Sequence, residues 1–277
     1  MALRRLIPVL LLWLLPSMAA AAGPAQAVWL FDAESGLLLR TEHAGSPADQ
    51  AALARVGPGS TLKPFLLLAA LQGGLNARQT VLCPSRPIAA PPETRCWLAA
   101  GHGATDLRRG VAHSCSTYAR HACRHVDADR YRRLLSEAGF HDLPDAANFR
   151  AMGCEGWMGA QPGIAATAAE LAQAYRWLWK ELRGRKGAGP AALRAGLTEA
   201  CLTGTAAGVR RGRALLSVAG KTGTSAGPSG RQVGVFVGLT PVEKPRRIIV
   251  VMMLDGDGAT AAELAGRVLA KQSFTAP

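Results

Sequence analysis

Residues 57–65 read GPGSTLKPF, and they open a long apolar run that continues to residue 71. The run favours a helix buried on all sides, which begins near Ser60 and ends at the glycine pair 73–74. Pro64 is compatible with this helix because the N–H groups of a first helical turn have no helical partners. The spacing of three residues places Ser60 and Lys63 on one face of the helix, one turn apart.

This serine–lysine pair is chemically useful. A serine hydroxyl is a poor nucleophile at neutral pH, and a desolvated lysine amine beside it can accept its proton. The partial positive charge at the start of a helix also favours an alkoxide or an oxyanion nearby. Short motifs match often by chance, so the pair on its own fits an ordinary surface serine and lysine at a helix start better than a catalytic pair.

The segments around this helix alternate in type. A hairpin is expected at residues 28–39, and helices at 106–112, 131–138 and 164–182. After a solvated loop at 183–189 the pattern changes to strands, at 215–225, 232–239 and 247–254, and the chain closes with a helix at 259–271. This order predicts an α+β fold: an antiparallel sheet built from both chain ends, flanked by helices, with an inserted helical region.

Two further short motifs follow the first along the chain. They are Ser114-Cys115-Ser116 and Lys221-Thr222-Gly223. Each is weak alone, but the three in this order resemble the penicillin-binding protein transpeptidase domain, within the penicillin-recognising serine enzymes. Gly204-Thr205-Ala206 and Gly159-Ala160-Gln161 also resemble segments of that family. The resemblance covers nearly all of residues 28–277 and includes no glycosyltransferase domain.

The resemblance implies a serine D,D-transpeptidase or carboxypeptidase. Such an enzyme acts on peptidoglycan stem peptides ending in D-Ala-D-Ala through an acyl-enzyme, and it binds β-lactams such as penicillin. Ser60 is then the nucleophile, Lys63 the base, and Ser114 a relay of the proton toward the leaving amine. Lys221 adds positive charge opposite the substrate carboxylate.

The remaining implied residues bind the substrate. The hydroxyls of Thr222 and Thr224 hold the carboxylate, and the backbone N–H groups of Ser60 and Thr224 form the oxyanion hole. Gly223 is expected because a side chain there would block a substrate laid along the strand. No cofactor and no metal are expected.

Ser116 departs from the family pattern, which usually has asparagine at this position. Serine is too short to reach both the lysine and the substrate carbonyl without a water. This departure leaves open a catalytically weak peptidoglycan-binding or sensor module on the same fold. A β-lactamase similar to class D enzymes is a further alternative, although no glutamate stands where it could activate a deacylating water.

The N-terminus has the pattern of a secretory signal peptide at residues 1–27. Arg4 and Arg5 precede an apolar run at 6–15, and small residues end at Ala22 or Ala27. The run is short for a membrane span, although an uncleaved anchor is the alternative. The pattern predicts export to the periplasm or cell envelope.

Six cysteines fit an oxidising compartment. Cys83 and Cys96 flank a proline-rich loop and are the expected disulfide. The other four, Cys115, Cys123, Cys154 and Cys201, allow three pairings, among which Cys123 with Cys154 is a candidate. No short Cys/His spacing predicts zinc.

The chain carries a formal net charge of +13. In an exported protein such a charge favours anionic membrane or cell-wall polymers as partners. Nucleic acid is not expected, because the arginines are scattered and the aromatic residues are too few for a stacking surface.

Overall fold

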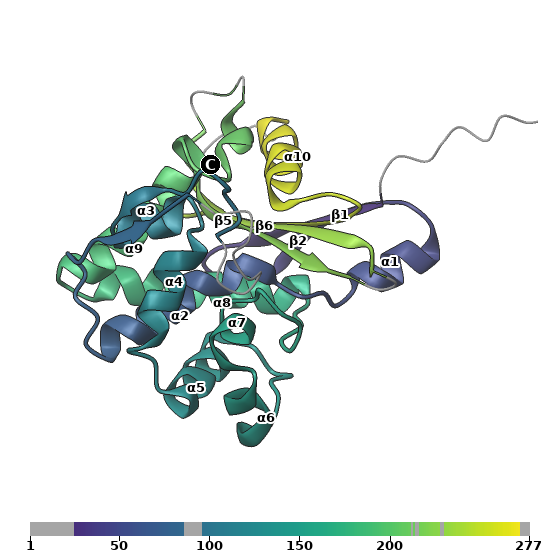
Figure 1. Ribbon diagram of the computed structural model, residues 1–277. Coiled ribbons are helices and arrows are strands. Elements are labelled where there is room, and N and C mark those ends of the chain that lie inside the picture. The colour runs from purple at the N-terminus through teal and green to yellow at the C-terminus, as the bar shows by residue number, and fades with distance from the viewer. Residues whose placement is uncertain (1–24, 86–95, 212, 214–215, 228–229, 272–277) are drawn as a thin grey trace, which may run out of the picture.

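A five-stranded antiparallel sheet forms the centre of the computed structural model (Figure 1). The structure describes residues 25–85, 96–211, 213, 216–227 and 230–271. The strand order is β2-β1-β7-β6-β5, and β1 pairs with β7 with Val28 opposite Val251. The sheet therefore joins the two chain ends, which confirms the predicted α+β fold. Its strands are β1 (Gln26–Asp32), β2 (Leu38–Ala44), β5 (Ala219–Ala226), β6 (Gln232–Thr240) and β7 (Arg247–Leu254).

The two faces of this sheet are buried against different helices. Because side chains alternate along a strand, Phe236 and Val251 face helix α10 (Gly258–Ala270), while Val235 and Met252 face the larger layer of helices. Figure 1 shows the sheet nearly edge-on, with α10 on one side and α8 (Ala168–Gly184) on the other. The near-continuous apolar sequences of β6 and β7 follow from this two-sided burial.

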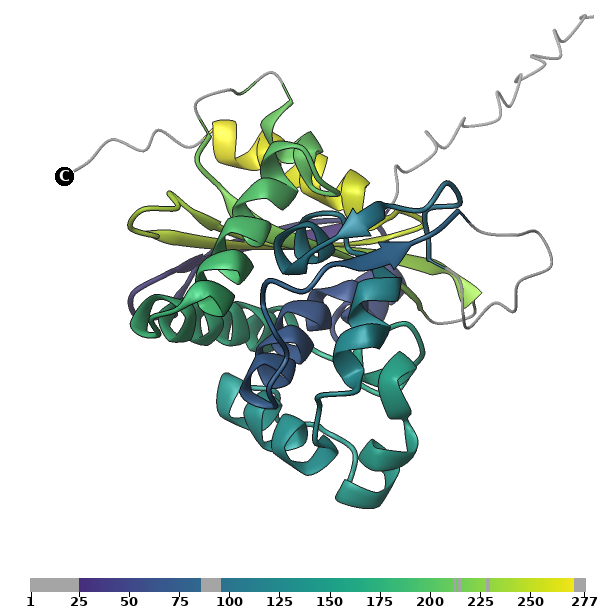
Figure 2. The same ribbon diagram turned by 60° about the vertical axis from the view of Figure 1, so that its left-hand side comes forward.

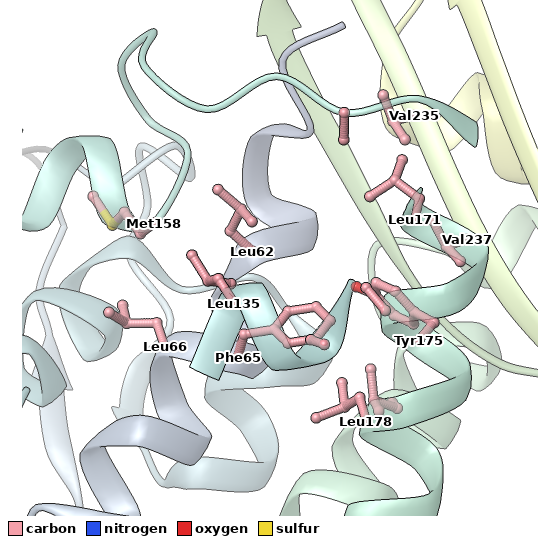
Figure 3. Close-up of a cluster of buried hydrophobic side chains, with 14 of the residues drawn as sticks. Leu62, Phe65, Leu66, Leu135, Met158, Leu171, Tyr175, Leu178, Val235 and Val237 are labelled. Atoms are coloured by element: carbon pink, nitrogen blue, oxygen red, sulfur yellow. The ribbon is translucent and has the colours of Figure 1, made fainter. Parts of the chain in front are cut away.

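Helix α2 (Lys63–Gln72) runs through the larger core, as the apolar sequence predicted. Phe65 packs edge-on against Tyr175 and Phe140, with ring centroids 5.5 and 5.7 Å apart. Figure 3 shows Phe65 and Tyr175 in this cluster, with Val237 of the sheet beside them. Ser60 lies in the 3₁₀ helix η1 (Gly59–Leu62) directly before α2, so the Ser60–Lys63 motif spans the junction of the two and is held between the sheet and the helical layer.

The remaining elements lie mostly in the inserted region. A two-stranded sheet contacts α4, and Figure 2 brings it to the front of the molecule. The elements are α1 (Pro47–Leu53), η1 (Gly59–Leu62), β3 (Val81–Cys83), β4 (Gly103–Thr105), α3 (Leu107–Ala112), α4 (Ser116–Cys123), α5 (Ala128–Ala138), α6 (Ala146–Ala151), α7 (Gly153–Trp157), α9 (Ala188–Leu202) and η3 (Ala207–Arg210).

Several short helices (α1, α4, α6 and α7) were not expected from the sequence, and two longer helices differ from the expectation. Helix α9 occupies residues that were expected to lead from a loop into strands, because its glycines and proline conceal the helical pattern. A Cβ at Gly196 would lie 2.7 Å from the Arg108 carbonyl oxygen, so this glycine permits close packing of α9 on α3. Helix α8 begins at Ala168 rather than 164, where Thr167 and Glu170 form a capping box.

Of the two disulfides predicted from the sequence, one is confirmed and the other is wrong. A disulfide joins Cys123 to Cys154 and so links α4 to α7, which confirms that candidate pairing. The predicted Cys83–Cys96 disulfide is wrong, because both residues are buried free thiols. Their sulfurs lie beside His102, as described below.

The expected signal peptide falls mainly outside the described residues. Strand β1 begins at Gln26, however, so Gln26 and Ala27 of the expected leader form part of the sheet. Among the described residues, no helix is both long and apolar enough to cross a membrane.

Candidate active site

The turn that carries Ser60 is fixed by contacts on both sides. Thr61 donates from its hydroxyl to the Pro58 carbonyl at 2.7 Å, and the Tyr175 hydroxyl donates to the Thr61 carbonyl at 2.8 Å. Gly59 has a φ of 57°, and a Cβ there would lie 2.6 Å from the Thr224 carbonyl oxygen. Only glycine combines this backbone conformation with so close an approach, so the Ser60 turn lies directly against strand β5.

Lys63 is buried beneath this turn and contacts the second motif. Its Nζ donates to the Ser114 carbonyl at 2.9 Å and to the Ser116 hydroxyl at 3.1 Å, and it lies 3.5 Å from the Ser114 hydroxyl. Burial lowers the pKa of Lys63 to about 8 because it disfavours the ammonium form. About a tenth of Lys63 is therefore an unprotonated amine at pH 7, a much larger fraction than for a free lysine.

The second motif bends the chain between two helices. Ser114 follows α3 with a φ of 54°, an uncommon conformation for a residue other than glycine. Cys115 caps α4, and its sulfur accepts the Tyr118 N–H at 3.4 Å. This bend turns Ser114 and Ser116 toward the same lysine amine.

The third motif lies on β5, opposite the first two. Lys221 is fully buried, donates to the Thr222 carbonyl at 2.9 Å, and has a pKa well below that of a free lysine because of burial. The Thr222 hydroxyl is 2.6 Å from that of Thr205, and the Thr224 hydroxyl accepts the Gly258 N–H at 3.1 Å. The Thr224 proton is therefore available to another acceptor.

Gly223 has a structural reason in addition to the one expected. A Cβ on Gly223 would lie 2.2 Å from the Pro58 carbonyl oxygen and 3.0 Å from the Thr61 methyl carbon. It would thus collide with the Ser60 turn. The glycine permits contact between the first and third motifs.

One cavity of about 440 Å³ brings the predicted residues together. Lys63 and Lys221 lie beneath its wall. Trp97, Gln232 and Asp257 also line it, and sequence reasoning did not single them out, since each is an isolated side chain in a loop or at an element's end. The predicted residues that line the cavity are Ser60, Ser114, Ser116, Thr222, Gly223 and Thr224.

A second cavity, of about 570 Å³, adjoins the first along β5. The two share Thr224 and Gln232, and the second is also lined by Gly159 and Gln161, in the segment that resembled the family. Together they leave β5 bordered by space for an extended ligand.

Four residues near the second motif have a donor set that can hold a metal ion. Cys83, Cys96, His102 and Cys115 place their ligand atoms within 4.8 Å of one another. The expectation of no metal rested on the absence of short Cys/His spacings in the sequence. It missed this cluster because loops separate the four ligands along the chain. No other such group occurs in the described part of the chain.

The fold, with three serine- and lysine-bearing motifs gathered around one cavity, is that of a known class of domain. The sequence profile of the penicillin binding protein transpeptidase domain matches residues 27–181, more than half of the chain. The chain therefore belongs to the penicillin-binding protein transpeptidase family.

Individual relatives agree with this assignment. The chain is 25% identical to the peptidoglycan D,D-transpeptidase MrdA of Acinetobacter baumannii, over 75% of this chain and 41% of that protein. It thus spans about two fifths of the length of this curated relative. Solved structures share the fold. Pseudomonas aeruginosa PBP2 in complex with WCK 5153 superposes with a TM-score of 0.69 at 19% sequence identity, over 89% of this chain and 72% of that one. The D,D-transpeptidase domain of a peptidoglycan glycosyltransferase from Eggerthella lenta superposes with a TM-score of 0.70 at 19% identity, over 90% of this chain and 78% of that one.

Proposed function

We propose that this protein is an exported serine D,D-transpeptidase or carboxypeptidase that acts on peptidoglycan stem peptides ending in D-Ala-D-Ala. The observation that carries the proposal is the placement of Lys63, whose buried amine contacts Ser114 and Ser116 in the wall of the cavity that Ser60 lines. A buried amine with a lowered pKa is the base that a serine nucleophile needs.

The reaction proceeds through an ester on Ser60. The Ser60 oxygen attacks the carbonyl carbon between the two D-alanines while Lys63 accepts its proton, and the N–H groups of Ser60 and Thr224 stabilise the oxyanion. The C–N bond then breaks, and a proton passed by way of Ser114 leaves with the terminal D-alanine. An amine that attacks the ester forms a cross-link, whereas water releases the shortened peptide.

The substrate carboxylate binds at the β5 end of the cavity. The Thr222 and Thr224 hydroxyls face it, and buried Lys221 supplies positive charge from beneath when it is protonated. The adjoining cavity along β5 accommodates the rest of an extended peptide.

Penicillin should acylate Ser60 and leave slowly. Asp257 is the carboxylate among the residues that line the Ser60 cavity, and it is engaged as the N-cap of α10, where it accepts from the Thr260 N–H and hydroxyl at 2.8 Å. Unless Lys63 also activates the water, as in the class D-like alternative, hydrolysis of the ester lacks a general base that would accelerate it roughly 10²–10⁴-fold.

Intact-mass analysis after incubation with penicillin tests the proposal. One penicillin should add to each chain and persist for many minutes. Ser60→Ala should abolish the adduct, and Ser136→Ala, on the exposed face of α5, should keep it. A folded protein that never forms the adduct favours the sensor module, and rapid drug turnover favours the class D-like β-lactamase.

Export follows from the N-terminal pattern, and the +13 charge favours association with anionic membrane or wall polymers. Both fit a peptidoglycan substrate, which lies outside the cytoplasmic membrane.

A further inference from the structure

Three thiols and one imidazole converge beside the active site. Cys83 ends β3, His102 precedes β4, and Cys115 caps α4, so the groups come from separate elements. Cys83, Cys96 and Cys115 are 1%, 5% and 1% exposed. The Nδ1 atom of His102 lies 3.6 Å from the Cys83 sulfur and 3.4 Å from the Cys96 sulfur.

These separations match the edges of a metal tetrahedron. Bonds of about 2.3 Å to sulfur and about 2.0–2.1 Å to nitrogen, at tetrahedral angles, place S and N about 3.5–3.6 Å apart. Three cysteines and one histidine are a ligand set of structural zinc sites, and thiolates select soft or borderline metals over calcium and magnesium.

Neither a disulfide nor simple apolar packing accounts for all four groups. A disulfide can use two of the three sulfurs and leaves the third beside an imidazole. Cysteines that serve as small apolar side chains have no reason to surround a ring nitrogen. In an oxidising compartment, three adjacent free thiols are also prone to pair, whereas metal-bound thiolates are protected.

We propose that Cys83, Cys96, His102 and Cys115 bind one Zn²⁺, and that this ion holds the Ser114-Cys115-Ser116 segment against Lys63. The three thiols lose their protons as the three Zn–S bonds form. Cys115 lies between the two serines that contact Lys63, so its position sets theirs.

The ion also connects this segment to the edge of the cavity. Trp97, which lines the cavity, packs edge-on against His102 with ring centroids 5.5 Å apart, and its indole N–H donates to the His113 carbonyl at 3.0 Å. A zinc ion bound by His102 would therefore connect three parts of the structure: Trp97 at the edge of the cavity, the β3–β4 sheet, and Ser114 with its left-handed backbone conformation. This positioning effect rests on the proposed function, whereas metal binding does not.

Elemental analysis of the purified full chain, with zinc supplied during expression, tests the site directly. About one zinc per chain is expected, and Co²⁺ in its place should give the thiolate charge-transfer bands and strong visible bands of tetrahedral cobalt. Cys83→Ser and His102→Ala should lose most of the metal, while Cys201→Ser, a buried free cysteine outside the cluster, should retain it. Folded wild-type protein without zinc after reconstitution, or with a disulfide among Cys83, Cys96 and Cys115, overturns the site.

Acylation by a fluorescent penicillin tests the positioning effect on the wild-type chain before and after chelation. Removal of zinc should slow acylation about 10–100-fold, and added zinc should restore it. Equal rates in the two forms overturn the positioning effect while leaving the metal site in place. A zinc-loaded chain that is never acylated contradicts the proposed function instead.

Discussion

Lys63 and Lys221 are both buried in this site, but their surroundings differ. Lys63 contacts the Ser114 and Ser116 hydroxyls, whereas Lys221 donates to a backbone carbonyl under the β5 threonines. Burial lowers the pKa of each, since a desolvated ammonium is costly. Because Lys63 lies one turn from Ser60, it is the lysine whose protonation state should govern acylation.

The rate of acylation should therefore rise with pH. The pKa of Lys63 is lowered to about 8, so the amine that accepts the Ser60 proton becomes more abundant as pH increases toward that value. The second-order rate with a fluorescent penicillin should increase about tenfold per pH unit up to roughly pH 7 and level off above about pH 8. A flat profile between pH 6 and 9, with the protein folded throughout by circular dichroism, argues against Lys63 as the base.

Ser116 makes one of the two contacts expected of asparagine. Its hydroxyl reaches Lys63 directly at 3.1 Å, without a water, and we expect its short side chain not to reach a substrate carbonyl as well. Ser116→Asn should supply that contact and raise the acylation rate, by up to about tenfold for one hydrogen bond. Ser116→Ala is the matched control and should be slower than wild type. If Ser116→Asn is also slower, the pocket is adapted to serine.

At the scale of elements, α4 is held at both ends. Its first turn follows Cys115, and its last residue forms the disulfide to Cys154 of α7. Arg120 and Glu155 add an ion pair between the same two helices at 2.6 Å. Ser116 thus stands at the start of a cross-linked helix.

Loss of this disulfide should destabilise the fold. The Cys123–Cys154 bond spans 31 residues, and closing such a loop restricts the unfolded chain by about 2–4 kcal/mol. A Cys123→Ala/Cys154→Ala variant should melt roughly 4–16 °C lower, with the difference measured by calorimetry without reductant. Melting within about 1 °C of wild type would mean that the helix contacts alone determine stability.

Elements with uninterrupted patterns were predictable, and those set by distant contacts were not. The apolar runs of β6, β7 and α2 follow directly from burial. Helix α9 was missed because Gly189, Pro190 and Gly196 disfavour a helix locally, and close packing on α3 compensates. The Cys83–Cys96 disulfide was wrong for a similar reason: spacing could not reveal that His102 and Cys115 fold against both sulfurs.

At the scale of the molecule, the order of three short motifs was enough to predict which residues share a cavity. The order alone did not reveal that Gly223 also permits contact between β5 and the Ser60 turn. The sequence also did not predict that Trp97 and Asp257 line the cavity, because both lie on loops whose paths depend on the whole fold.

The sheet itself constrains where a signal peptide can be removed. Gln26 and Ala27 pair with Met253 and Met252 of β7, Ala27 is fully buried, and the Ala25 carbonyl accepts the Leu254 N–H at 2.9 Å. A chain that starts at Val28 loses these contacts from a central strand, whereas one that starts at Gly23 keeps them.

The mature protein should therefore begin near Gly23, after Ala22. Edman sequencing of the exported protein gives the site directly. As a separate measure, a purified chain starting at Val28 should be less stable than one starting at Gly23 by about 2–4 kcal/mol, for two or three lost backbone hydrogen bonds and one buried methyl group. Urea unfolding of the two chains compares them under identical conditions. Equal midpoints, or a mature N-terminus at Val28, would show that the first residues of β1 are dispensable to the sheet.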